Sequence, residues 1–102
     1  MNKVEILFKD KGINIGTDLH PIYVYTKKNA LQFIEECRKE SINILGIDGF
    51  YIGKDYIRPS MENSIDYSTE SSQKLNLDVH LESVKFLNAQ SNELFFEIVC
   101  DD

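Results

Sequence analysis

The hydrophobic and polar positions of this chain change their period several times, and each change marks an expected element. Across residues 3–8 apolar and polar side chains alternate, which is the pattern of a half-buried β-strand. Residues 21–25 are expected to form a second strand, at a sheet edge, because the proline that begins it has no N–H for a ladder. From residue 26 to residue 40 the apolar positions recur every three or four residues, which predicts an amphipathic helix with Thr26 as its N-cap.

The strongest strand signal lies at residues 42–48, where both faces are apolar. Such a run is typical of a buried central strand, which we expect to be covered on each side, with the helix on one of them. Gly46 inside the run indicates a bulge or the close approach of another backbone. Asp48 and Gly49 are a turn signal, so this strand is expected to end there.

The second half of the chain adds further strands and one ambiguous segment. Short strands are expected in YIGKDYI (residues 51–57) and SIDYS (residues 64–68), with GKD and PSMEN as turns. Residues 74–88 fit an alternating strand and a helix; we favour the helix, and both remain open. Residues 93–100 have the pattern of a buried last strand. The order predicts one α+β domain, residues 1–102, with a single mainly antiparallel sheet and one or two helices packed on it.

Length and composition predict one small globular domain and say little more about function. The chain has 102 residues, 42% of them hydrophobic, and no apolar run approaches the roughly 18 residues of a membrane span. Charged residues near the start do not resemble a signal peptide, so we expect a cytoplasmic protein without membrane contact. Cys37 and Cys100 match no zinc or redox spacing, and in that compartment both are expected to be reduced and partly buried thiols.

The distribution of charge along the chain is more informative about function than length and composition are. The net charge is −6, and residues 1–42 hold seven Lys/Arg and six Asp/Glu, whereas residues 43–102 hold four and eleven. Nucleic-acid binding needs Lys and Arg at the phosphates, so the acidic half is not expected to bind nucleic acid directly. A basic protein partner suits it better. The alternative is that the acids only keep the domain soluble.

The chain contains few candidates for catalytic chemistry. His20 and His80 have no companion residues in sequence, and neither a nucleophile elbow nor a phosphate-binding loop is present. Asp48, Asp55 and Asp66 offer carboxylates for a divalent cation, but their spacing matches no cation-binding loop. We therefore expect no catalytic residue, no metal site and no cofactor.

A mixed group of aromatic and charged residues follows the central strand. These residue types are enriched at the energetic centres of protein–protein interfaces. The candidate partner-binding residues are Asp48, Tyr51, Asp55, Tyr56, Arg58, Glu62, Asp66 and Tyr67. The three tyrosine hydroxyls are expected to stay within reach of water or a partner, although strand alternation directs some aromatic side chains of such a group into the core.

The segment from about residue 29 to residue 68 resembles the immunity proteins of the tRNA-anticodon-cleaving colicin type, and more broadly immunity proteins of polymorphic toxin systems. The resemblance rests on Ala30 in the helix and on the run ILGIDG that follows it. Arg58, Ser64 and Tyr67 then match at the same spacing. The chain departs from the family at residues 50–54, where the positions that would select a toxin lie.

The resemblance implies a mechanism. Immunity proteins of this type bind the nuclease domain of the toxin at its substrate groove, where acids replace phosphates and aromatic rings replace stacked bases. The residues that would supply charge are Asp48, Asp55, Glu62 and Asp66, and those that would stack are Tyr51, Tyr56 and Tyr67. The implied partner is a basic toxin nuclease domain, expected to be an RNase, and the chain would be a monomer or a weak dimer.

Several alternatives stay open at the level of sequence. Asp48 has a second possible role as the cap of its own turn. Arg58 is a candidate to pair with Asp48 or Asp66 within the protein. Two other function classes remain: a different acidic interaction module or nucleic-acid mimic, and a small carboxylate-dependent hydrolase.

Overall fold

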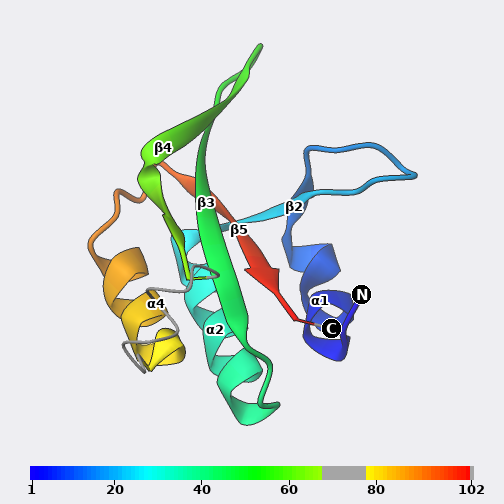
Figure 1. Cartoon of the computed structure of the whole chain (residues 1–102). Helices are drawn as coiled ribbons and strands as arrows, with labels where there is room; N and C mark the ends of the chain where they lie inside the picture. The colour runs from blue at the N-terminus through cyan, green and yellow to red at the C-terminus, as the bar shows by residue number, and fades with distance from the viewer. Residues whose placement is uncertain (68–77, 102) are drawn as a thin grey trace.

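The computed structural model describes residues 1–67 and 78–101, which form an α+β arrangement around one antiparallel sheet (Figure 1). The sheet has five strands in the order β1-β2-β5-β3-β4. The strands are β1 (Ile13–Asn14), β2 (Tyr23–Thr26), β3 (Ile44–Ile52), β4 (Ile57–Asp66) and β5 (Phe95–Cys100). The helices are α1 (Lys3–Phe8), the short 3₁₀ helix η1 (Lys9–Lys11), α2 (Lys27–Lys39) and α4 (Val79–Asn88). The fold class predicted from the sequence is confirmed.

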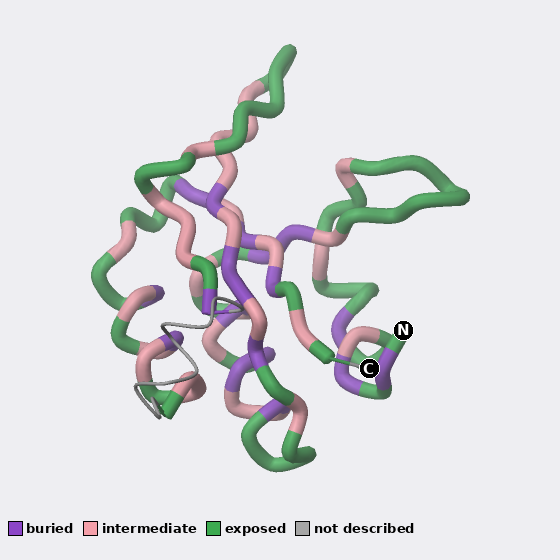
Figure 2. Tube along the Cα trace, viewed as in Figure 1, coloured by how far each residue is buried: buried purple, intermediate pink, exposed green. Residues whose placement is uncertain are grey.

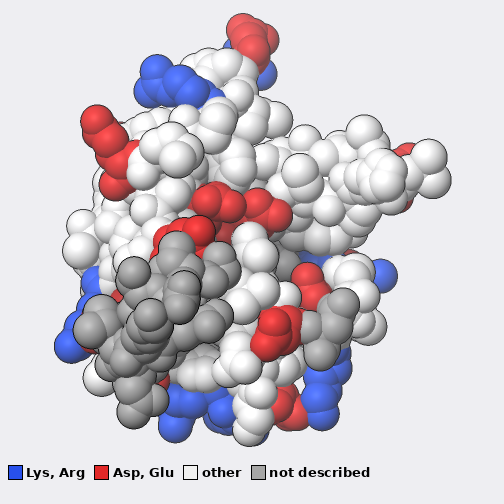
Figure 3. Space-filling model, in the orientation of Figure 1, with Lys and Arg blue, Asp and Glu red and all other residues white. Residues whose placement is uncertain are grey.

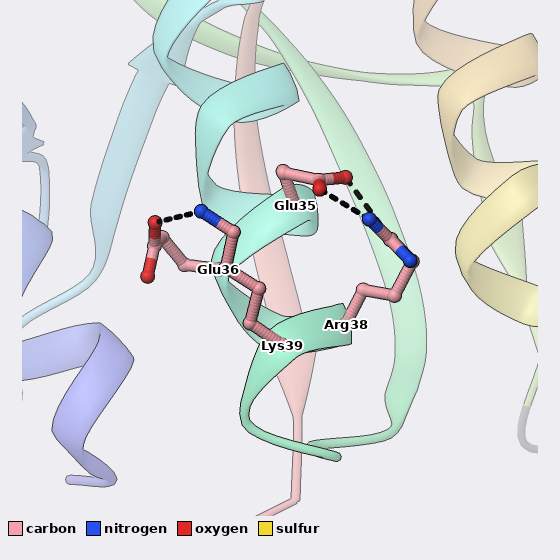
Figure 4. Close-up of polar contacts among 4 residues, drawn as sticks. All are labelled: Glu35, Glu36, Arg38 and Lys39. Atoms are coloured by element: carbon pink, nitrogen blue, oxygen red, sulfur yellow. Dashed lines mark hydrogen bonds and ion pairs between the residues drawn. The ribbon is translucent and has the colours of Figure 1, made fainter.

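Helix α2 forms where the helical period predicted it. The Thr26 side chain accepts a hydrogen bond from the Asn29 N–H and caps the first turn. Its buried residues recur at helical spacing and are Ala30, Phe33, Ile34 and Cys37. On the outer surface, Arg38 pairs with Glu35 and Lys39 with Glu36 (Figure 4). Exposed pairs of this kind contribute little to stability, so the buried stripe is what holds the helix in place.

The core lies between the sheet and helices α2 and α4, on one face of the sheet. Its fully buried side chains include Phe33 of α2, Leu87 of α4, Ile47 of β3 and Phe96 of β5 (Figure 2). Burial of each such side chain stabilises the fold by about 1.5–3 kcal/mol. Among the described elements, no helix covers the other face of β3, β4 and β5, which faces the viewer in Figure 1. The described helices therefore cover the central strand on one side only.

Residues 3–8, predicted to be a strand, form helix α1. Asn2 and Glu5 make a reciprocal capping box: the Asn2 side chain accepts from the Glu5 N–H, and the Glu5 side chain accepts from the Asn2 N–H. Val4 and Phe8, four residues apart, are buried on one side of the helix, whereas Ile6 is 55% exposed. The capping box gives hydrogen-bond partners to N–H groups at the start of the helix. The two buried side chains have helical spacing, and this favours a helix over the strand that the alternating apolar and polar pattern predicted.

The prediction of an edge strand at residues 21–25 is also wrong. Strand β2 lies between β1 and β5 and pairs with both in antiparallel register. It begins at Tyr23, so Pro21 lies outside the ladder, and its missing N–H removes no hydrogen bond between strands.

Strand β3 does not end at Asp48 and Gly49, where a turn was predicted. It continues to Ile52, and the hairpin turn lies at residues 53–56, where the Gly53 N–H donates to the Tyr56 carbonyl at 2.9 Å. The predicted GKD turn is thus confirmed, and the Asp48-Gly49 turn is not. Because no turn follows Asp48, its alternative role as a turn cap is wrong as well.

Residues 59–63, predicted to be a turn, belong to an irregular part of β4. Gly49 pairs with Ser60 and Ile47 pairs with Ile65, so β4 carries extra residues opposite β3 and bulges. A Cβ at Gly49 would lie 2.4 Å from the Asn63 carbonyl oxygen, which is why glycine is needed there. The close backbone approach predicted at Gly46 is confirmed, since a Cβ there would lie 3.0 Å from the Ile65 carbonyl oxygen.

The ambiguous segment is helical where it is described. Helix α4 begins after Asp78, whose carboxylate accepts from the Leu81 N–H at 3.1 Å. Residues 74–77 of the predicted segment and Ser68 of SIDYS lie outside the described residues. No helix within residues 1–67 or 78–101 is long and apolar enough to cross a membrane.

Candidate partner-binding surface

Three carboxylates from neighbouring strands lie together on the face of the sheet opposite the core. Asp48 of β3 is directly opposite Glu97 of β5 in the ladder, and Asp66 of β4 is opposite Gly46, two residues before Asp48. Because side chains two residues apart share a face of a strand, all three project to the same side. Figure 3 shows Asp and Glu side chains gathered in the middle of this face. We call Asp48, Asp66 and Glu97 the acidic face.

The carboxylates of the acidic face raise one another's pKa values. Partial burial raises the pKa of Asp48 above its ordinary value, and the negative charge of Asp66 raises it further. Burial also raises the pKa of Glu97, with a further contribution from Asp48. Like charges placed opposite each other across strands destabilise a sheet. A cation supplied by a partner would favour the ionised form of both groups.

A shallow hollow of about 390 Å³ adjoins these acids. Its lining combines Asp48 and Asp66 with the apolar side chains of Leu45, Met61 and Val99. Met61 is 86% exposed, which is unusual for a large apolar side chain. Lysine and arginine pack their aliphatic stems on apolar surface and hold the charged group at a polar rim. The hollow therefore suits a basic side chain.

Other predicted site residues lie on the distal part of the β3–β4 hairpin, which projects from the body of the molecule (Figure 1). Tyr51 packs against the core cluster, and the Arg58 guanidinium lies 5.1 Å from the centre of its ring. Asp48 and Tyr51 are three residues apart on one strand, so they point to opposite faces. The single patch expected from the sequence is therefore divided between the two faces of the sheet. Arg58 contacts Tyr51 rather than the predicted carboxylates.

The end of the hairpin is exposed. Figure 2 shows exposed residues at the tip of the projecting hairpin. Asp55 lies in the turn, and Tyr56 beside it is 57% exposed. Glu62 is also exposed, on the bulged part of β4. The exposure of Tyr56 agrees with the prediction that this tyrosine lies within reach of water or a partner. None of these three residues belongs to the acidic face.

Tyr67 is not part of any accessible surface. Only 6% of it is exposed, and its ring belongs to the core cluster, while its N–H donates to the Leu45 carbonyl at 2.8 Å. Burial raises the pKa of its hydroxyl, which lies beside the buried Ser83 hydroxyl. The prediction that this hydroxyl stays within reach of water or a partner is wrong, because strand alternation has directed the side chain into the core.

Glu97 was missed by the sequence reasoning. The signal for it is the single charge inside the otherwise apolar run FFEIVC, at a position that alternates with the buried Phe96 and Ile98. Its proximity to Asp48 depends on the pairing of β3 with β5, which joins distant parts of the chain.

Within the ranges that the structure describes, no group of three His, Cys, Asp or Glu side chains is arranged to hold a metal ion. No protein-family model matches the chain, and no curated protein sequence matches it. The acidic face is therefore the feature from which a function can be inferred.

Proposed function

We propose that this protein is a cytoplasmic immunity protein that binds a cognate bacterial toxin, an RNase, and blocks its active site with the acidic face. The observation that carries the proposal is the alignment of Asp48, Asp66 and Glu97 on three neighbouring strands of a sheet face left open by α2 and α4. An RNase holds its substrate through basic residues at the phosphates. A row of carboxylates is complementary to such a groove, and the resemblance of about residues 29–68 to immunity proteins supports the same assignment.

The raised pKa values of Asp48 and Glu97 support a binding role over mere solubility. A carboxylate that only keeps a protein soluble is expected to be fully hydrated, because burial of a charge costs free energy. Asp48 and Glu97 are instead half-buried beside like charges. A protein retains such an unfavourable arrangement when function needs it. Insertion of lysine or arginine between these carboxylates would turn repulsion into attraction and would add contacts with Leu45 and Val99 in the hollow.

The exposed hairpin residues have a secondary role in this proposal. Tyr56 offers a large, accessible aromatic ring of the type enriched in interface hot spots. Asp55 and Glu62 are exposed, and charges at an interface rim change association rates more than affinities. Tyr67, being buried, contributes by holding the end of β4 in the core.

The test is a titration with the toxin domain encoded immediately upstream, by calorimetry and by an RNA-cleavage assay. We expect a Kd of about 1 nM or lower, and inhibition that excess RNA reverses, because both ligands would occupy one groove. The double substitution Asp48→Asn/Glu97→Gln should weaken binding about 100-fold, because close charge pairs at interfaces couple by about 1.5 kcal/mol or more each.

The control variant is Asp10→Asn/Glu82→Gln, which removes the same two charges elsewhere. Asp10 is exposed on η1, and Glu82 lies on α4, on the covered side of the sheet. We expect it to bind within about 3-fold of the unsubstituted protein, as surface changes away from an interface usually do. Equal losses in the two variants would reject the acidic face as the binding site. No binding of the toxin at all would reject the immunity assignment and favour another acidic interaction module.

A further inference from the structure

Two cysteines from distant parts of the sequence meet inside the fold. Cys37, near the end of α2, belongs to the buried core cluster, and Cys100, at the end of β5, packs against the same cluster. The backbone explains the contact. The Ile42 N–H donates to the Cys37 carbonyl at 2.9 Å, so the chain turns directly from α2 into β3, where Ile44 pairs with Cys100.

The two thiols differ in their surroundings. Cys37 is fully buried in the core cluster, and the neighbouring Cys100 side chain and burial both raise the pKa of its thiol well above the ordinary value. Cys100 is only half-buried, and the Asn2 side-chain amide donates to its sulfur at 3.2 Å. The thiolate is the nucleophilic form of a cysteine. Cys100 is the more exposed of the two cysteines, so we expect it to react first with a reagent.

We propose that Cys37 and Cys100 are a site of reversible disulfide formation, with a low-molecular-weight disulfide such as oxidised glutathione as the oxidant. In the first step the Cys100 thiolate attacks one glutathione sulfur, the S–S bond of the oxidant breaks, and one reduced glutathione leaves. Cys37 then loses its proton to water, and its thiolate attacks the Cys100 sulfur of the mixed disulfide and releases the second glutathione. The two electrons lost by the cysteines reside in the two glutathione thiols.

The new bond would connect the last turns of α2 to the end of β5. It would close a long loop containing β3, β4 and α4, and such a crosslink stabilises chiefly by restricting the unfolded chain. Cys100 and Glu97 occupy positions of opposite parity on β5, so they face opposite sides of the sheet. Oxidation is therefore expected to leave the acidic face unchanged, and the inference does not depend on the proposed function.

The experiment exposes the full chain to oxidised and reduced glutathione mixtures, followed by alkylation, intact mass measurement and peptide mapping. We expect a product about 2 Da lighter with no alkylated thiol, a peptide linking Cys37 to Cys100, and a thermal midpoint higher by about 10 °C. The second step should accelerate with rising pH, because it needs the Cys37 thiolate.

Two variants separate the steps. The Cys37→Ala variant should stop at the mixed disulfide, with a mass about 305 Da higher and an unchanged thermal midpoint. The Cys100→Ala variant should undergo neither step, because its remaining thiol, Cys37, is buried. Circular dichroism checks that both variants fold. If one variant does not fold, peptide mapping of the unsubstituted protein still tests the proposal. Retention of two alkylatable thiols, or accumulation of the mixed disulfide in the unsubstituted protein, would overturn the proposal.

Discussion

Asp48 and Glu97 face each other across the β3–β5 ladder, and each is partly withdrawn from water. Burial and the neighbouring charge raise the pKa of each carboxyl, so the folded protein holds these protons more tightly than the unfolded chain does. The free energy of unfolding must then fall as the pH rises from the ordinary carboxyl pKa of about 4 through the raised value. At neutral pH both carboxylates therefore destabilise the fold.

Replacement of Glu97 by glutamine removes this effect at one position. At about pH 7, Glu97→Gln should raise the free energy of unfolding by roughly 0.2–1 kcal/mol, the range for cross-strand charge pairs. At about pH 3, where the carboxyl is protonated in both states, the substitution should change little. Urea unfolding at the two pH values measures the difference. Glu93→Gln, at an exposed position, is the control and should have no effect at either pH; a Glu97→Gln protein less stable at neutral pH would contradict the expectation.

At the scale of elements, the β3–β4 hairpin depends on glycine where β4 bulges. A Cβ at Gly49 would meet the Asn63 backbone oxygen at 2.4 Å, whereas a Cβ at Gly53 would meet only the ring of the exposed Tyr56. Gly49→Ala should therefore lower the free energy of unfolding by about 1–3 kcal/mol, and Gly53→Ala should be nearly neutral because the ring can move away. Urea unfolding of both variants provides the comparison, and equal losses would mean that the bulge does not require Gly49.

The elements predicted best are those with a long, regular hydrophobic period. Helix α2 presents four buried side chains at helical spacing, and no local alternative competes. Helix α1 was misread because it has fewer than two turns, so Val4 and Phe8 satisfy alternation as well as helical spacing. Its distinguishing signal is the capping pair of Asn2 and Glu5.

The candidate site was predicted only in part, for a similar reason. Asp48 and Asp66 were identified because they follow the central strand along the chain. Glu97 was missed, and Tyr67 was placed on the surface, because which side chains share a face depends on register between strands. The bulge in β4 changes that register, and the pairing of β3 with β5 joins segments that are distant in sequence. The local pattern of residues along the chain predicts neither the bulge in β4 nor the pairing of β3 with β5.

At the scale of the whole molecule, the acidic face is one part of a field to which all charges contribute. The net charge is −6, and the excess of acids lies entirely in residues 43–102. Lys and Arg side chains appear mainly around the margins in Figure 3, with acids nearer the middle. Such a distribution attracts a basic partner from a distance and also orients it as it approaches. Net charge and its position therefore make separate contributions to association.

Two variants of equal net charge distinguish these contributions. Asp48→Asn/Glu97→Gln and Asp10→Asn/Glu82→Gln each remove two negative charges, which leaves −4 in place of −6. Stopped-flow association with the toxin domain, at about 50 and about 500 mM NaCl, should show at least about a tenfold fall in rate for the unsubstituted protein. If position matters, the first variant loses most of that salt dependence and the second keeps it. Equal salt dependence in both variants would mean that overall charge attracts the partner and that docking occurs elsewhere.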